Sequence, residues 1–142
     1  MKILNHILIF LHAFVGIGAI AGGLAAIINP YEPMGITTDV LKNSPFNDFL
    51  IPGIILFIII GLGNIVSAVV LGLDYKYKGY VCSIFSWALV IWIVVQCIML
   101  YDVVALHVIY FIIGLVMAAL SAMILFHKRQ FPANIILNFL GK

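Results

Sequence analysis

The sequence predicts an all-α membrane protein built as an antiparallel bundle of four transmembrane helices. Hydrophobic residues make up 65% of the 142 residues and charged residues only 8%, whereas in soluble domains roughly a quarter of the residues are charged. The charges are also unevenly placed, since Asp102 is the only formal charge between Lys78 and His127. That block is long enough for two helices of about 20 residues, the length that spans the hydrocarbon layer. We therefore expect the chain to turn back at Tyr101-Asp102.

Four stretches of the chain meet this length. They cover approximately residues 3–28, 49–72, 79–100 and 104–126, with an outer loop at 29–48 and a tail at 127–142. The outer loop is the longest remaining segment and is too short to bury a core of its own. We expect a single transmembrane domain over residues 1–142, without a soluble catalytic or nucleic-acid-binding domain.

The first span, 3–28, places its small and polar residues on one face. They recur at heptad-like spacing, as Asn5, His12, Gly16, Ala19, Gly23 and Ala26, beside a Gly18-x-x-x-Gly22 step. Apolar side chains face lipid without cost, but small and polar residues in a membrane helix usually face other helices. We therefore expect this face to lie inside the bundle, with the glycines allowing close helix packing.

The sequence of the outer loop predicts a short helix at the membrane interface. Pro30–Gly35 is rich in turn residues, and Thr37 or Thr38 can cap a short helix that ends near Lys42. The loop is therefore expected to hold local structure at the membrane surface.

The second span is expected to have a kinked start. Ser44 is a good N-cap and Pro45 suits the first helical position, so a helix is predicted to begin there. Pro52 lacks the N–H that would bond the carbonyl of Asp48, which predicts a kink. Residues 45–51 should therefore lie near the interface and bend into the span.

The other three spans carry comparable stripes of small and polar residues. The second has Gly61, Asn64, Ala68 and Gly72 on one face with Ser67 adjacent, the third has Cys82, Ser86 and Gln96, and the fourth has His107, Gly114, Ala118 and Ser121. A polar side chain inside a membrane is costly unless it has a partner. These stripes are therefore predicted to be the inward faces of the bundle.

The distribution of lysine and arginine predicts the orientation. One side of the spans holds Lys2, Lys76, Lys78, Lys128, Arg129 and Lys142, and the other holds only Lys42. Cytoplasmic loops collect these residues, so both termini are expected in the cytoplasm, with the chain in a bacterial inner membrane. The apolar segment after Phe131-Pro132 is too short to span and is expected to form a short interfacial helix on the membrane surface.

The polar residues fall into two layers when depth is counted at about 1.5 Å per residue. The inner layer is predicted to be a structural hydrogen-bond network and holds His12, Asn64, Ser67, Ser86 and Ser121. The outer layer has two interpretations. It is either a hydrogen-bonded cap or an outward-facing pocket for a polar headgroup or small polar solute, lined by Asp48, Gln96, Asp102 and His107.

Metal and cofactor chemistry is not predicted. Haem ligation needs two axial histidines at one depth, whereas His12 and His107 differ by roughly 12 Å along the helix axes. Asp102 and His107 form the nearest approach to a metal-ligand spacing on one helix, and that spacing is marginal. The sequence contains no HExxH, GxSxG or Walker motif. We therefore expect no cofactor, no metal and no catalytic residue.

Four short motifs stand out along the chain. They are Ser44-Pro45-Phe46-x-Asp48-Phe49-Leu50-Ile51-Pro52-Gly53, Gly61-x-Gly63-Asn64, Trp92-Ile93-Val94-Val95-Gln96 and His107-x-x-Tyr110-Phe111-x-x-Gly114. Over most of the chain they resemble a group of small, uncharacterised bacterial membrane proteins with four helices. The resemblance implies the four-helix architecture and carries no activity over, because that group has none assigned.

Two classes of function fit these features best. The first is a non-enzymatic membrane protein, either an accessory subunit of a larger membrane-protein partner or a binder of lipid or a small hydrophobic ligand. The alternative is a small oligomeric transporter or channel, in which two copies pack through the glycine-rich first span. That alternative lacks an Asp, Glu, Lys or Arg deep in any span to couple ions. An enzyme acting on lipid or quinone at the outer face is a third, weaker interpretation.

Overall fold

The computed structural model describes residues 2–35, 38–42, 44–100, 105–131 and 133–141, and every regular element within these ranges is helical. In chain order the elements are α1 (Lys2–Ile28), the 3₁₀ helices η1 (Pro33–Gly35) and η2 (Thr38–Leu41), α2 (Leu50–Ile55), the π-helix η3 (Leu56–Leu62), α3 (Gly63–Gly72), α4 (Lys78–Leu100), α5 (Ala105–His127) and α6 (Ala133–Phe139). Tyr101, Asp102 and Lys142 lie outside the described residues.

Four helices are long and apolar enough to cross a membrane. They are Lys2–Ile28, Leu50–Gly72, Lys78–Met99 and Ala105–His127. The second of them combines α2, η3 and α3 into one continuous helix. All four agree with the predicted spans to within one residue at each end, which confirms the prediction of four long apolar helices.

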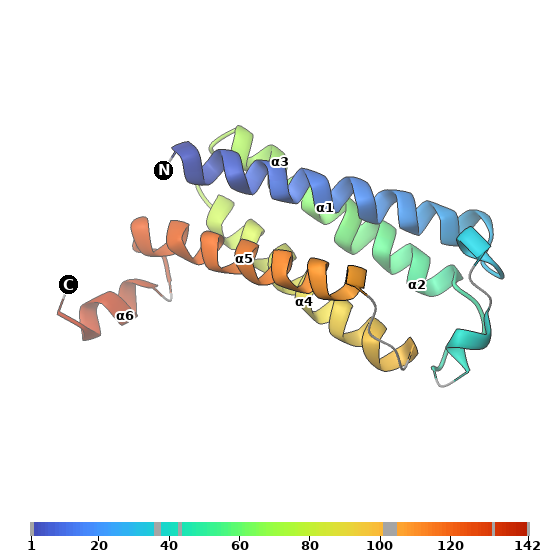
Figure 1. Ribbon diagram of the computed structural model, residues 1–142. Coiled ribbons are helices and arrows are strands. Elements are labelled where there is room, and N and C mark those ends of the chain that lie inside the picture. Colours follow the sequence, from blue (N-terminus) through green and yellow to red (C-terminus); the bar gives the residue numbers. More distant parts are fainter. Residues whose placement is uncertain (1, 36–37, 43, 101–104, 132, 142) are drawn as a thin grey trace.

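The long helices pack as two antiparallel pairs (Figure 1). α1 lies along α2, η3 and α3, whereas α4 lies along α5, and the pairs meet where α3 touches α4 and α1 touches α5. The N-terminus, the connection 73–77 and the end of α5 gather at one end of the molecule, called here the basic end. Its described cations are Lys2, Lys76, Lys78, Lys128 and Arg129. The described residues between 29 and 49 lie at the opposite end, called the loop end.

Large apolar side chains fill the interior between the helices. Among the most completely buried, each no more than 2% exposed, are Leu8, Val15, Ile60, Met117 and Ile124. Leu8 and Val15 come from α1, Ile60 from η3, and Met117 and Ile124 from α5. They belong to one hydrophobic cluster, which therefore joins both helix pairs. These side chains form the centre of the described molecule.

Glycines set how closely the helices of the first pair approach. A Cβ on Gly23 would lie 2.8 Å from the carbonyl oxygen of Gly53, and one on Gly16 would lie 3.0 Å from that of Gly61. Such distances leave no room for a side chain, because the opposing atoms belong to the backbone. Gly18 instead faces Tyr110 of α5, Gly22 faces Leu56, and Gly114 faces Val90 of α4.

The second membrane-length helix begins later than predicted. The helix starts at Leu50 rather than at Pro45, because Ser44 closes a turn instead of capping. Its hydroxyl donates to the carbonyl of Leu41 at 2.8 Å and accepts the N–H of Phe46 at 3.2 Å. Pro52 therefore lies in the first helical turn, where its missing N–H would have had no partner within the helix. The predicted kink at Pro52 has no basis in this geometry.

The irregularity in this helix lies further along, in the π-helix η3. A π-helix bonds each N–H to the carbonyl five residues back, so one extra residue is accommodated and the helix widens. The sequence from Leu56 to Leu62 is apolar apart from Gly61 and gives no signal of this change. The widened segment packs on α1 and leads directly into Asn64.

Two short elements match what the sequence predicts. η2 provides the short helix in the outer loop, and α6 provides the helix in the tail. The apolar side chains of Ile135, Ile136 and Phe139 are all exposed on α6. The N–H of Phe49 donates to the carbonyl of Pro30 at 2.9 Å, which closes the base of the outer loop.

Candidate functional site

The inner layer is centred on a buried pair from two helices. Nδ1 of His12 lies 2.7 Å from Oδ1 of Asn64, and Nδ2 of Asn64 donates to the carbonyl of Ile60 at 2.6 Å. Because Asn64 uses its NH₂ group on that carbonyl, its oxygen must accept from His12, so Nδ1 of His12 carries the proton. Both side chains are completely buried.

The serines of the inner layer are satisfied differently. Ser67 donates to the carbonyl of Gly63, and Ser86 donates to that of Cys82, so both bond within their own helices. Ser121 accepts from Ser83 at 2.9 Å and thereby joins α5 to α4. Ser83 was not among the residues predicted for the inner layer, although it lies on α4 close to Cys82 and Ser86 of the predicted stripe. The side-chain bonds described here thus connect α1 to α3 and α4 to α5.

Two buried ring nitrogens have no hydrogen-bond partner among the described residues. They are Nε2 of His12 and Nε1 of Trp92. The first is an acceptor in the tautomer derived above, and the second can only donate. Trp92 lies in the same apolar cluster that surrounds the inner layer. The inner layer therefore holds one buried ring nitrogen, Nε2 of His12, without a partner among the described residues.

The residues predicted for an outer pocket do not share one cavity in the described structure. Oδ1 of Asp48 accepts the N–H of Leu50 at 2.9 Å, at the start of α2. Gln96 is half-buried on α4, His107 is half-buried on α5, and Asp102 is outside the described residues. Among the described residues of this set, His107 lines a cavity.

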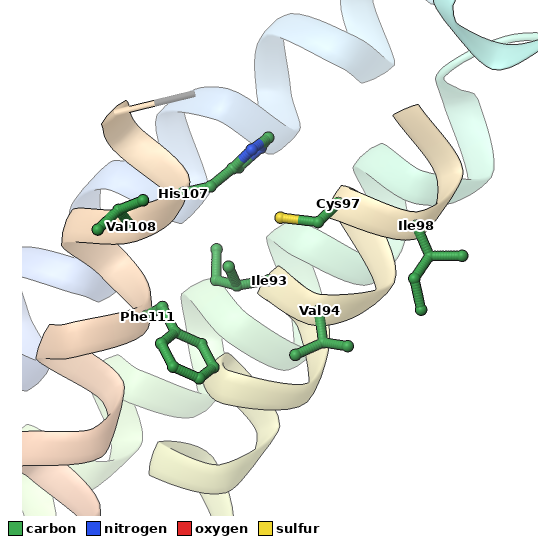
Figure 2. A pocket seen from close by; sticks show the side chains of 7 residues that line it. All are labelled: Ile93, Val94, Cys97, Ile98, His107, Val108 and Phe111. Carbon is green, nitrogen blue, oxygen red and sulfur yellow. The ribbon is translucent and has the colours of Figure 1, made fainter. Parts of the chain in front are cut away.

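That cavity, called here the upper groove, is lateral and lies between α4 and α5 near the loop end (Figure 2). Its volume is about 350 Å³, and its walls are Ile93, Val94, Cys97 and Ile98 of α4 with His107, Val108 and Phe111 of α5. Figure 2 shows His107 and Cys97 extending toward one another from the facing helices. His107 is thus the only strongly polar side chain in an apolar wall.

A second cavity, called here the lower groove, lies between the same helices nearer the basic end. Its volume is about 640 Å³, and Tyr80 and Phe131 line its basic end. Sequence reasoning missed the lower groove because it treated small residues such as Ala118 only as packing positions. The signal that could have located this groove is the stripe of alanines on α5, opposite larger side chains of α4.

No metal site is built by the residues that the structure describes. Within residues 2–35, 38–42, 44–100, 105–131 and 133–141, no three of His, Cys, Asp and Glu converge on one point. Cys82 and Cys97 are both free thiols.

Comparison with known proteins finds no match for this chain among protein-family models, curated proteins or solved structures. The resemblance to small bacterial four-helix membrane proteins therefore stays a prediction. The geometry of the grooves and layers is the basis for a proposal about function.

Proposed function

We propose that this chain is a multi-pass membrane protein, folded as an antiparallel four-helix bundle, that binds a lipid chain or small hydrophobic ligand in the upper groove. Support for insertion comes from the long helices, whose outward side chains are apolar. Ile3, Ile17, Ile98 and Leu106 are each more than 60% exposed. Exposing so large an apolar surface to water is unfavourable, whereas contact of that surface with lipid chains is not.

The upper groove carries the binding proposal. Ligand sites are mostly apolar concavities of about 300 to 1,000 Å³ with a few polar groups that fix orientation. The upper groove, at about 350 Å³ with His107 as its polar group, fits the lower end of that range. Val94, Ile98 and Val108 are exposed at its rim, so a ligand can reach it sideways from the membrane.

The burial of the inner layer favours binding over transport. A transport pathway needs polar groups that reach water from at least one side. His12 and Asn64 are completely buried, as are the apolar side chains of Leu8 and Val15 on α1 and Ile60 on η3. We therefore propose that the inner layer fixes helix register, and that the exchange with ligand takes place at the lateral surface.

Saturable photolabelling tests the binding proposal. The full-length protein in phosphatidylcholine nanodiscs would be irradiated with a diazirine fatty acid, with and without excess unlabelled fatty acid. We expect the competed label to map to the walls of the upper groove. Val108→Trp, which fills the groove, should abolish the competed label. Ile109→Trp, an equally exposed substitution that does not line the groove, should leave it unchanged.

Labelling spread evenly over the lipid-facing surface, or equal loss in both tryptophan variants, would count against a site. In that case the accessory role would be the remaining form of the proposal, and co-purification under mild detergent would be its direct test.

A further inference from the structure

The lower groove has a graded chemistry along its length. On the α4 side it is lined by Ile84 and Trp87, and on the α5 side by Ala118, Ala119 and Ala122. The three alanines leave the wall of α5 shallow, so the larger side chains of α4 form one side of an open apolar channel. Toward the basic end the lining changes to the aromatic rings of Tyr80 and Phe131.

Two lysines lie close in the chain and in space to this aromatic end. Nζ of Lys128 is 3.4 Å from the carbonyl of Lys76, and Nε2 of Gln130 is 3.1 Å from the same carbonyl. Gln130 directly precedes Phe131, and the N–H of Tyr80 donates to the carbonyl of Tyr77, next to Lys76. The connection 73–77 and the end of α5 are thus tied together beside the groove.

The charge at this end is not balanced by acids in the described part of the chain. Asp74 is the only acid of the basic end there, and it is paired with Lys78. Lys76 and Lys128 are both exposed, and Nζ of Lys76 also lies 5.3 Å from the centre of the Tyr77 ring. An anion placed between these two ammonium groups would meet a net positive field.

We propose that the lower groove is a binding site for an anionic phospholipid, with one acyl chain along the alanine wall and the headgroup phosphate between Lys76 and Lys128. The order of apolar wall, aromatic rings and lysines follows the order of acyl chain, interface and phosphate in a lipid. A helix from a second copy would cover the apolar wall but leave the two lysines without a counter-charge. The proposal rests on membrane insertion and is independent of ligand binding in the upper groove.

Native mass spectrometry of the full-length protein would test this site. The protein would be reconstituted in vesicles of phosphatidylcholine mixed with phosphatidylglycerol, then released and scored for retained lipid. We expect preferential retention of one phosphatidylglycerol. Each lysine near a membrane surface contributes roughly a fivefold preference for anionic lipid, so K76Q/K128Q should reduce the preference by about twentyfold or more. K2Q/K42Q removes the same charge at other positions and should change it little.

Filling the groove separates a site from general surface charge. Ala119→Trp should lower phosphatidylglycerol retention, whereas Met123→Trp, which is exposed on α5 outside the groove lining, should not. Equal loss in K76Q/K128Q and K2Q/K42Q would overturn the proposal in favour of diffuse electrostatics. A change of oligomeric state in Ala119→Trp without loss of lipid would overturn it in favour of a second copy.

Resistance to carbonate extraction keeps the two proposals distinct. A protein extracted from vesicles by carbonate would overturn membrane insertion and this site together. A protein that stays inserted but retains both lipids equally would overturn the anionic-lipid site alone. Val108→Trp should leave phosphatidylglycerol retention unchanged, because Val108 lines the upper groove and not the lower one.

Discussion

Nδ1 of His12 and Oδ1 of Asn64 are hydrogen-bonded to each other, and neither atom has another partner among the described residues. The pair shows why depth along the helices was a good guide for this contact. Counting residues from the basic end puts both side chains at one level, and facing helices then bring them together. The same count could not show that Ser83, rather than Ser86, bonds to Ser121 of α5, because the rise along a helix axis does not give a residue's direction around that axis.

Asn64→Leu should destabilise the protein, because it leaves the Nδ1–H of His12 buried without an acceptor. Interhelical bonds in membrane proteins contribute about 0.6 kcal/mol on average, and an unsatisfied buried donor costs about 1 to 3 kcal/mol. We expect a loss in that upper range in thermal unfolding in detergent. Ser67→Ala is the control, since Ser67 bonds only within its own helix. A variant N64L as stable as S67A would show that the pair contributes little.

Asp74 and Lys78 provide a pH-dependent contact at the basic end. The hydrogen bond and charge of Lys78 lower the pKa of the Asp74 carboxyl from its ordinary value of 3.8. A lowered folded-state pKa means that the stabilisation is present above pH 3.8 and is lost as pH falls through the lowered value. Asp74→Asn should therefore lower the melting temperature at pH 7 and have a shrinking effect in acid.

The exposed acid Asp39 at the loop end gives the comparison for this measurement. Asp39→Asn should shift the melting temperature little at either pH. A D74N difference that grows toward acid would contradict the assigned sign.

At the scale of elements, the sequence predicted the long helices well and their internal details less well. The length of the apolar stretches was enough to predict all four helices, because each stretch is long enough to cross the hydrocarbon layer as a helix. The start of α2 was wrong because Ser44 and Pro45 suit a turn as well as a helix N-terminus. The π-helix η3 was not predicted, since Leu56–Leu62 offers no periodic pattern that distinguishes five-residue from four-residue bonding.

The contact between α1 and α2 gives a sharp prediction on neighbouring glycines. A Cβ on Gly23 would lie 2.8 Å from both the Gly53 carbonyl oxygen and the Phe57 backbone nitrogen, whereas one on Gly22 would lie 3.4 Å from a Leu56 side-chain carbon. Overpacking against atoms that cannot move aside costs about 1 to 3 kcal/mol. Gly23→Ala should lower the unfolding temperature, and Gly22→Ala should maintain or raise it. Equal effects would mean that the helices are not held this closely.

For the whole molecule, the upper groove was beyond prediction from the sequence, because no residue pattern marks its walls. The polar residues predicted an outer pocket at Asp48, Gln96, Asp102 and His107, and of the three that the structure describes, His107 lines the upper groove. A groove is the space between two helices and depends on their relative rotation and on the side chains of both. The residues of a single helix do not show how that helix is rotated relative to its neighbour.

The lysine distribution predicts the orientation of the whole molecule in a membrane. In a variant with Cys82 and Cys97 replaced by alanine, a single cysteine would be placed at Lys76 or at Val40. We expect an impermeant thiol reagent added outside intact cells to label the cysteine at position 40 and spare the one at position 76. The reverse pattern would overturn the predicted orientation, and labelling of both only after cell lysis would show that position 40 is shielded.

The polar side-chain bonds in the spans have a consequence for biogenesis. His12 bonds to Asn64 inside the first helical hairpin, and Ser83 bonds to Ser121 inside the second. In the proposed membrane fold, the first hairpin can therefore leave the translocon with its interhelical contact already made, before the second hairpin has been synthesised. Docking of the two hairpins is then a matter of shape and apolar fit, so two separately translated halves, divided in the 73–77 connection, should still find each other in the bilayer.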